Sequence, residues 1–274
     1  MLHSHDHQKK PTISRIISQF VQKNRILFLI LAVLLFLLPL GYLVVQQIDE
    51  KSKNDATTRL YELEKKYEEY SAKKDGEDAV KAKEEFLAYM QDTISGFNGR
   101  SAEYRAREII ADMNLEEIAK EDTANKAELL KETLKEYLII IEKAPEFALM
   151  PKFVLVTGRM IEGLPARAEK EGTDKIEISV QDLKTVLPAQ FQKLGDVEVE
   201  TYSDFALSLY LYSSEKQPKS PFILETLVNI GRLYEKREMR EKAIEVYEKL
   251  ERDFSNNDWT NIAINRRIAL QAKE

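Results

Sequence analysis

The segment Leu134–Pro145 reads LKEYLIIIEKAP, and further along the chain Leu207–Pro218 reads LSLYLYSSEKQP. The two segments share Leu, Tyr, Leu, Glu, Lys and Pro in one ungapped register. The identities continue beyond the proline at the same offset, pairing Gly158 with Gly231, Arg159 with Arg232 and Glu162 with Glu235.

The repeated segment predicts a pair of helices. An aromatic Tyr packs one helix on its neighbour, a Pro ends that helix because it lacks an N–H, and the following helix carries a Gly where two helices approach closely. Such a pair cannot bury its apolar face alone, so copies are expected to stack. The sequence therefore predicts an all-α fold built as a helical solenoid.

The composition agrees with long helices. Of the 274 residues 32% are charged, mostly Glu and Lys, and there are only 9 Gly and 8 Pro. Amphipathic runs predict helices near 60–70, 80–90, 101–113, 124–142, 148–161, 202–214, 223–236 and 241–253.

One segment, LVNIGRLYEKREMREKAIEVYEKLERDFS, resembles a tetratricopeptide repeat. It departs from that family at Leu227, where Trp is frequent, at Leu250, where a small residue is usual, and at Ser255, where Pro usually closes the repeat. The resemblance rests on Leu227, Ile230, Gly231 and Tyr234 in the first helix and on Ala243, Tyr247 and Leu250 in the second.

Weaker copies of this pattern precede it. Ala206, Tyr210 and Pro218 match the closing half of one repeat, and Tyr137, Ile140 and Pro145 match that of another. The resemblance implies a degenerate solenoid, in which 258–270 forms a capping helix.

Twenty consecutive uncharged residues, Ile26–Val45, predict a transmembrane anchor, because a helix of this length spans about 30 Å of hydrocarbon. No A-x-A cleavage pattern follows them, so we expect the anchor to be retained. Lys9, Lys10, Arg15, Lys23 and Arg25 precede the run, which places the N-terminus in the cytoplasm by the positive-inside rule. This layout resembles single-pass, periplasm-facing tetratricopeptide-repeat proteins of the bacterial inner membrane.

Four regions follow from these signals. Residues 1–25 form a cytoplasmic tail with an amphipathic helix from Thr12, and 26–45 form the anchor. Residues 46–123 form a membrane-proximal helical region, and 124–274 form the solenoid. His3, His5 and His7 are spaced as metal ligands could be, yet a tail without supporting structure favours no specific site.

An insertion, 163–200, interrupts the helical pattern. Alternation at Ile176, Ile178 and Val180 and in VEVE is typical of two short strands. The other interpretation is a long loop with one helix, 181–194, interrupted at Pro188.

The chain carries no catalytic motif. It has no Cys, no phosphate-binding loop and no histidine beyond the tail, so we expect no enzymatic activity, no cofactor and no metal. Five of its 41 basic residues precede the anchor but only one of its 47 acidic residues does, so the exported part is strongly acidic and is not expected to bind nucleic acid.

The resemblance implies a protein-binding groove lined by fixed positions of the first helices. Arg159 and Arg232 are the residues that we expect to contact a partner's carboxylates, unless each pairs with a Glu of its own helix. The groove positions are Lys152, Leu155, Arg159, Glu162, Glu225, Val228, Arg232 and Glu235. The expected repeat-packing residues are Tyr137, Pro145, Gly158, Tyr210, Pro218, Gly231, Tyr234, Ala243 and Tyr247.

Two functions remain open at this point. The first is a membrane-tethered scaffold or adaptor in an envelope, secretion or motor complex, and the second is a periplasmic chaperone that holds exported polypeptides. In both, the partners are proteins of unknown identity and the lipid bilayer around 26–45.

Overall fold

The computed structural model describes residues 20, 22–73, 78–120, 125–169, 175–194, 197–255 and 257–272. The chain divides into two compact units, Met1–Thr58 and Arg59–Glu274. The three histidines and most of the amphipathic helix expected from Thr12 to Arg25 lie outside the described residues.

The apolar run of the first unit lies in helix α2, Arg25–Ser71, which continues past Val45 without a break. In the described part of the chain, α2 is the one helix long and apolar enough to cross a membrane. None of its apolar window is buried, whereas the core helix of a soluble protein is mostly buried. Length, composition and exposure are thus compatible with a single-pass anchor.

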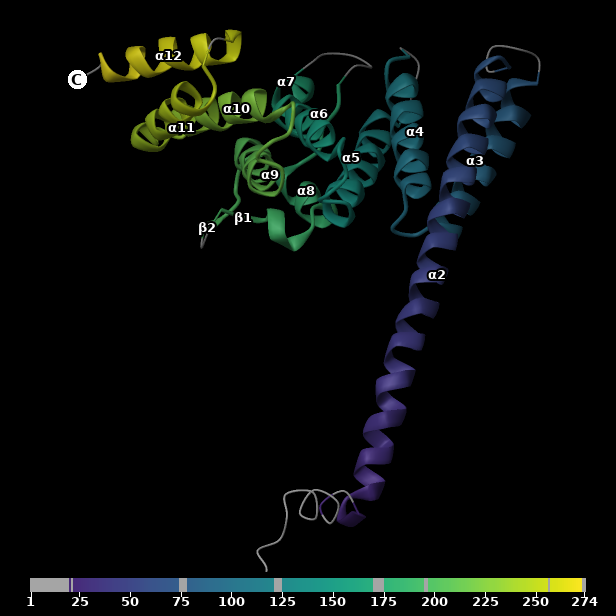
Figure 1. Ribbon diagram of the computed structural model, residues 1–274. Coiled ribbons are helices and arrows are strands. Elements are labelled where there is room, and N and C mark those ends of the chain that lie inside the picture. The colour runs from purple at the N-terminus through teal and green to yellow at the C-terminus, as the bar shows by residue number, and fades with distance from the viewer. Residues whose placement is uncertain are drawn as a thin grey trace, which may run out of the picture. The chain divides into compact units, whose positions relative to one another are not determined.

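The second unit is helical almost throughout, as the sequence predicts, and the predicted helices agree closely with those observed (Figure 1). Its main helices are α3 (Ala79–Gly96), α4 (Ser101–Ile118), α5 (Lys126–Lys143), α6 (Met150–Glu162), α9 (Tyr202–Lys216), α10 (Ile223–Lys236), α11 (Arg240–Asp253) and α12 (Asp258–Gln271).

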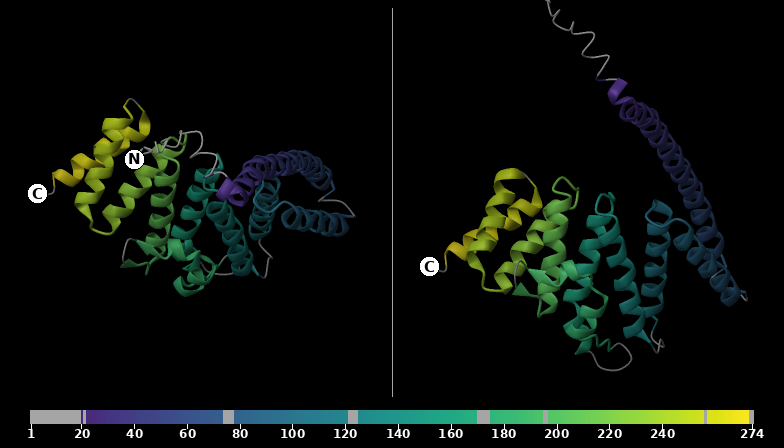
Figure 2. Two further views of the ribbon diagram at one scale, coloured as in Figure 1. Left: turned by 60° about the horizontal axis from the view of Figure 1, so that its bottom comes forward. Right: turned by 90° about the horizontal axis from the view of Figure 1, so that it is seen from below.

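These helices pack largely in the order of the chain, with each contacting the next and α6 contacting α9 (Figure 2). Helix α10 also contacts α6 and α12. One apolar core runs from Tyr104 to Ala263, and a smaller one joins Leu63, Phe86 and Met90 to α4. Since the long core is shared by all helices from α4 onward, no pair of them buries its apolar face alone.

The insertion combines features of both interpretations. Residues 175–179 form neither a helix nor a strand, and Ile176 and Ile178 are buried. The predicted helix ends early, because Pro188 interrupts it. The first two residues of VEVE form one strand of a hairpin whose strands are two residues long. The insertion contains α7 (Leu164–Ala168), α8 (Val180–Val186), the 3-10 helix η2 (Ala189–Phe191), β1 (Lys193–Leu194) and β2 (Val197–Glu198).

The loops that close the two copies of the repeated segment lie side by side. Gln217, next to Pro218, donates hydrogen bonds from Nε2 to the carbonyl oxygens of Pro145 at 2.7 Å and Phe147 at 2.8 Å. Both carbonyls belong to the loop between α5 and α6, so one side chain of the second copy binds the backbone of the loop that follows the first. This contact fixes the register of one helix pair on the next.

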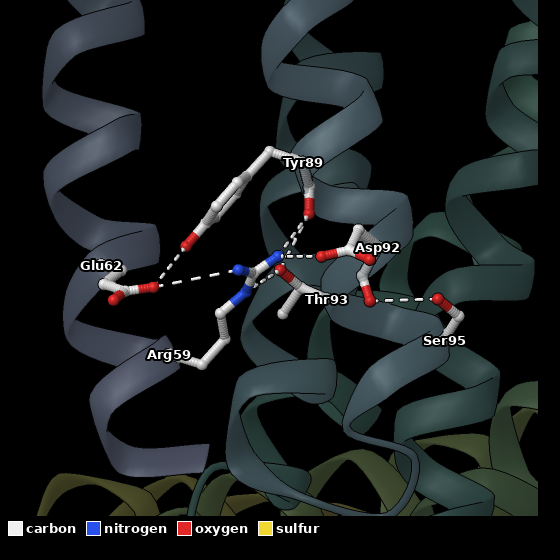
Figure 3. A network of polar contacts seen from close by, with 6 residues as sticks. All are labelled: Arg59, Glu62, Tyr89, Asp92, Thr93 and Ser95. Atoms are coloured by element: carbon white, nitrogen blue, oxygen red, sulfur yellow. Dashed lines mark hydrogen bonds and ion pairs between the residues drawn. The ribbon is translucent and has the colours of Figure 1, made fainter. Parts of the chain in front are cut away.

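Arg59 joins the end of α2 to α3 (Figure 3). Its guanidinium lies 3.8 Å from the ring centroid of Tyr89 and donates to Thr93 Oγ1 at 2.8 Å and to Asp92 at 2.5 Å. The Tyr89 hydroxyl in turn donates to Glu62 at 3.1 Å. Because its donors and its flat face are all engaged, we interpret Arg59 as a structural clamp.

The two repeated glycines lie where helices approach most closely. A Cβ on Gly158 would fall 2.5 Å from Cζ of Tyr210, and a Cβ on Gly231 would fall 2.3 Å from Cε1 of Tyr247. Both tyrosines are fully buried. Each ring therefore packs directly on the backbone of the facing helix, which only Gly permits.

We predict that Gly231→Ala destabilises the protein although Ala is the better helix former by about 1 kcal/mol. The Tyr247 ring cannot move away freely, because its hydroxyl is bonded to Glu235. Overpacking costs about 1–3 kcal/mol, and each kcal/mol lowers the melting temperature by about 2–4 °C. The matched control is Gly96→Ala, which meets no atom within 4 Å. Equal melting temperatures of the two variants by circular dichroism would contradict the prediction.

Candidate functional site: the exposed face of α6 and α10

The solvent-facing positions of α6 and α10 correspond in the repeat register. On α6 they are Lys152, Val156 and Arg159, which are exposed or half-buried. On α10 the equivalent half-buried residues are Glu225, Asn229 and Arg232. We call these six residues the α6–α10 face.

Two expected groove residues do not belong to this face. Leu155 is 3% exposed and Val228 is 7% exposed, and both lie in the main core. The outward positions of an α-helix recur every three or four residues. After Lys152 the next outward position is four residues on, at Val156, and the position three residues on, Leu155, is buried. The groove prediction is corrected at these two positions.

The two repeated arginines are bound to carboxylates of the neighbouring first helix. Arg232 on α10 donates from Nη2 to both carboxylate oxygens of Glu162 on α6, at 2.8 and 2.7 Å. Arg159 on α6 forms an ion pair with Glu225 on α10. The sequence left open that each Arg pairs with a Glu of its own helix. The structure shows instead that both arginines pair with a Glu of the other helix.

Similar ion pairs extend the series in both directions. Lys152 on α6 lies 3.4 Å from Glu108 on α4, and Arg266 on α12 lies 3.5 Å from Glu235 on α10. Charged side chains thus connect α4, α6, α10 and α12 in sequence. The acids of these pairs are largely buried, with the side chains of Glu108 and Glu162 9% and 13% exposed, so each pair fixes a carboxylate of one helix against a cation of the next.

Beneath the ion pairs, buried tyrosines donate to the same acids. The Tyr210 hydroxyl donates to Glu162 at 3.2 Å, and the Tyr247 hydroxyl donates to Glu235. In both tyrosines burial raises the pKa, and the neighbouring carboxylate raises it further. The phenols therefore stay protonated and act as permanent donors.

The same arrangement recurs at an earlier helix pair, with one difference. The Tyr137 hydroxyl donates to Asp112 of α4 at 2.8 Å, but no ion pair to Asp112 is found among the described residues. Burial raises the pKa of the Asp112 carboxyl, and the charge of Glu108 raises it further. The bond from Tyr137 lowers that pKa without offsetting the burial.

The remaining repeat-packing residues lie in the core or at helix ends. Ala243 is fully buried, Tyr234 packs against the core, and Pro145 and Pro218 follow the ends of α5 and α9. Sequence reasoning missed the acceptor role of Asp112 and the pairs made by Glu108 and Arg266. In the sequence, these residues could have been found as charged side chains on the first helix of each pair, in the helices that pack near the repeated tyrosines.

The described residues provide no group of three or more His, Asp or Glu arranged to hold a metal ion. Surface hollows of about 410 to 440 Å³ are lined by residues of α9 and α10, and by none of the six residues of the α6–α10 face. One of them is lined by Leu211, Tyr234 and Lys242 together with residues of the insertion. Its lining combines apolar side chains such as Leu211 with charged ones such as Glu215 and Arg237.

Comparison with known proteins gives no family assignment: no protein-family model, no curated protein and no solved structure matches the chain. The α6–α10 face is therefore interpreted from its own geometry.

Asp112 leads to a prediction about pH. A carboxyl whose pKa is higher in the folded than in the unfolded state favours folding when it is protonated. Its contribution to the free energy of unfolding is therefore largest at acid pH and is lost as the pH rises through the pKa of the folded state. Asp112→Asn, which is neutral at every pH, should therefore raise the melting temperature at pH 7 and raise it less at pH 4.

Tyr137→Phe is the matched variant for this test. It removes the hydrogen bond that lowers the pKa of Asp112, so it should make the stability of the protein fall more steeply between pH 4 and pH 7. Thermal unfolding at several pH values measures both effects. A melting-temperature gain for Asp112→Asn that does not change with pH would exclude the burial of a charged Asp112.

Proposed function

We propose that the chain is a membrane-tethered scaffold whose tetratricopeptide-like solenoid, residues 124–274, binds a partner protein outside the cytoplasm. In this proposal α2 anchors the chain in the inner membrane of a bacterium, and the second unit lies in the periplasm. The bound partner carries acidic side chains that meet the α6–α10 face.

The solenoid part of the proposal is supported by the equivalence of successive helices. Helices α6 and α10 each place a Gly against a Tyr of the second helix of their pair, α9 and α11. Helix α12 continues the series, because Arg266 follows Arg232 by one repeat length, about 34 residues, and lies 3.5 Å from Glu235 at the position where Arg232 meets Glu162. Helix α12 then corresponds to the first helix of a further repeat.

The single observation that carries the binding role is the exposed stripe on α6. The side chains of Lys152 and Arg159 are 49% and 58% exposed, and Val156 lies between them. Two cations that flank an apolar residue at helical spacing form a surface for an acidic peptide. Arg159 is the exposed member of its pair with Glu225, whose side chain is 19% exposed, so it is the arginine that a partner's carboxylate can reach.

Arg232 has a different role from Arg159 in this proposal. Its side chain is 35% exposed and it holds both oxygens of Glu162, to which Tyr210 also donates. Removing it would leave a partly buried carboxylate with one donor fewer. Arg232 therefore aligns the face, and Arg159 is the arginine available to a partner.

The topology part leads to the first prediction of this section. A reporter enzyme that is active only outside the cytoplasm, fused after Glu274, should be active, because the flank before Ile26 is basic. A reporter that is active only in the cytoplasm should be silent at the same position. The reverse pattern would refute the periplasmic placement.

The second prediction tests the face itself. Lys152→Glu combined with Arg159→Glu should reduce crosslinking to the partner more than tenfold in intact membranes, since a factor of ten requires only about 1.4 kcal/mol. The control is Lys249→Glu combined with Arg252→Glu, which makes the same charge change on exposed positions of α11. Circular dichroism should show that both variants keep their helical content.

The crosslinked proteins also separate the two candidate functions. A scaffold yields one constant set of partners, whereas a chaperone that holds exported chains yields many unfolded clients. Equal crosslinking by the face variant and its control would show that the α6–α10 face is not the working surface.

A further inference from the structure

Three buried tyrosines take equivalent places in successive helix pairs, and each donates its hydroxyl to an acid on the first helix of its pair. In the second and third pairs the acid also meets an arginine of the following first helix, Arg232 of α10 or Arg266 of α12. The complete arrangement is thus a carboxylate held between a phenol and a guanidinium. The tyrosines and their acids are Tyr137 with Asp112, Tyr210 with Glu162, and Tyr247 with Glu235.

The first pair has the tyrosine and the acid but not the arginine. The first helix that follows α4 is α6, and its residue equivalent to Arg232 is Arg159. Arg159 pairs with Glu225 of α10 instead. Within the part of the chain that the structure describes, Asp112 therefore differs from its two equivalents in having no arginine of its own chain.

The cations nearest to Asp112 are engaged by other acids. Arg105 of α4 forms ion pairs with Glu64 and Glu108, and Lys152 of α6 lies 3.4 Å from Glu108. Three carboxylates thus share two cations at this point, counting Asp112. Burial raises the pKa of the Asp112 carboxyl above its ordinary value, so a further cation would stabilise the ionised form.

We propose that an arginine of the bound partner supplies this cation, so that the partner carries a basic side chain between the acidic ones that meet Lys152 and Arg159. The inference rests on the proposed function, because the same partner covers the α6–α10 face. Asp112 is partly exposed and lies one turn along α4 from Glu108, which Lys152 contacts. A side chain bound beside Lys152 is therefore within reach of it.

A guanidinium suits a carboxylate that a phenol already binds. The Tyr137 hydroxyl lies 2.8 Å from Oδ1 of Asp112, and a carboxylate accepts several further hydrogen bonds. Glu162 shows that both donors fit at once, because it accepts from Tyr210 and from Arg232. A carboxylate of the partner would be repelled at this point, so only a basic side chain matches it.

The test uses the full chain in detergent and two fluorescent peptides that differ by one group. Each peptide is a short alanine-based helix with two glutamates, and between them one peptide has arginine and the other has citrulline, its uncharged isostere. By fluorescence anisotropy the parent chain should bind the arginine peptide at least about fivefold more tightly, because hydrogen bonds between ions exceed those of neutral groups.

Two variants show where that preference arises. Asp112→Asn should bind both peptides equally, because its amide carries no charge. The matched control is Glu132→Gln, which removes an exposed acid of α5 and should keep the preference. Circular dichroism should show that both variants keep the helical content of the parent.

Equal affinities of the two peptides for the parent chain would overturn the inference. So would the failure of either peptide to bind, or a preference for arginine that persists in Asp112→Asn. The proposed function is tested separately with the citrulline peptide, which Lys152→Glu combined with Arg159→Glu should weaken. If that variant binds the citrulline peptide as the parent does, the proposed function fails, and this result differs from the loss of the arginine preference alone.

Discussion

The second unit depends on the close approach of tyrosine rings to glycine backbones. In two successive helix pairs a buried Tyr lies against a Gly of the facing helix, and the ring's far end is held by a Glu of that same helix. The Gly lacks the Cβ that would collide with the ring, and the Glu fixes the position of the tyrosine hydroxyl by accepting its hydrogen bond. Together they determine both the distance between the two helices and their rotation, which places the outward residues of the first helices side by side.

Much of this architecture follows from the sequence because its physical causes are local. The repeated Tyr, Pro and Gly lie at fixed spacing, so the helices, their ends and the glycine contacts could be predicted from Leu134–Pro145 and its second copy. The insertion was harder, since Ile176 and Ile178 are buried in the main core although they lie in neither a helix nor a strand. Alternating residues alone do not distinguish these cases.

The candidate face was predicted only in part, for a reason of geometry. A spacing of three or four residues defines which residues lie on one helix face only to within one position. Leu155 and Val228 fall within that margin, and both lie in the core. The partners of the arginines depend on how far one first helix lies from the next, which no local pattern encodes. The sequence therefore indicated which residues are repeated but not that Arg159 and Arg232 bind across the helices in opposite directions.

These crossed pairs constrain how the face can work. A partner cannot simply add its carboxylates to free arginines, because Arg159 and Arg232 already have acidic neighbours. Binding at Arg159 is an exchange of one weak ion pair for another, so its net gain is small and depends on the ionic strength. Affinity must come from apolar contact around Val156 and from the number of sites engaged at once. In the proposed function a stack of repeats anchored at the membrane would provide such multiple contacts, since joining weak sites raises avidity without strengthening any one of them.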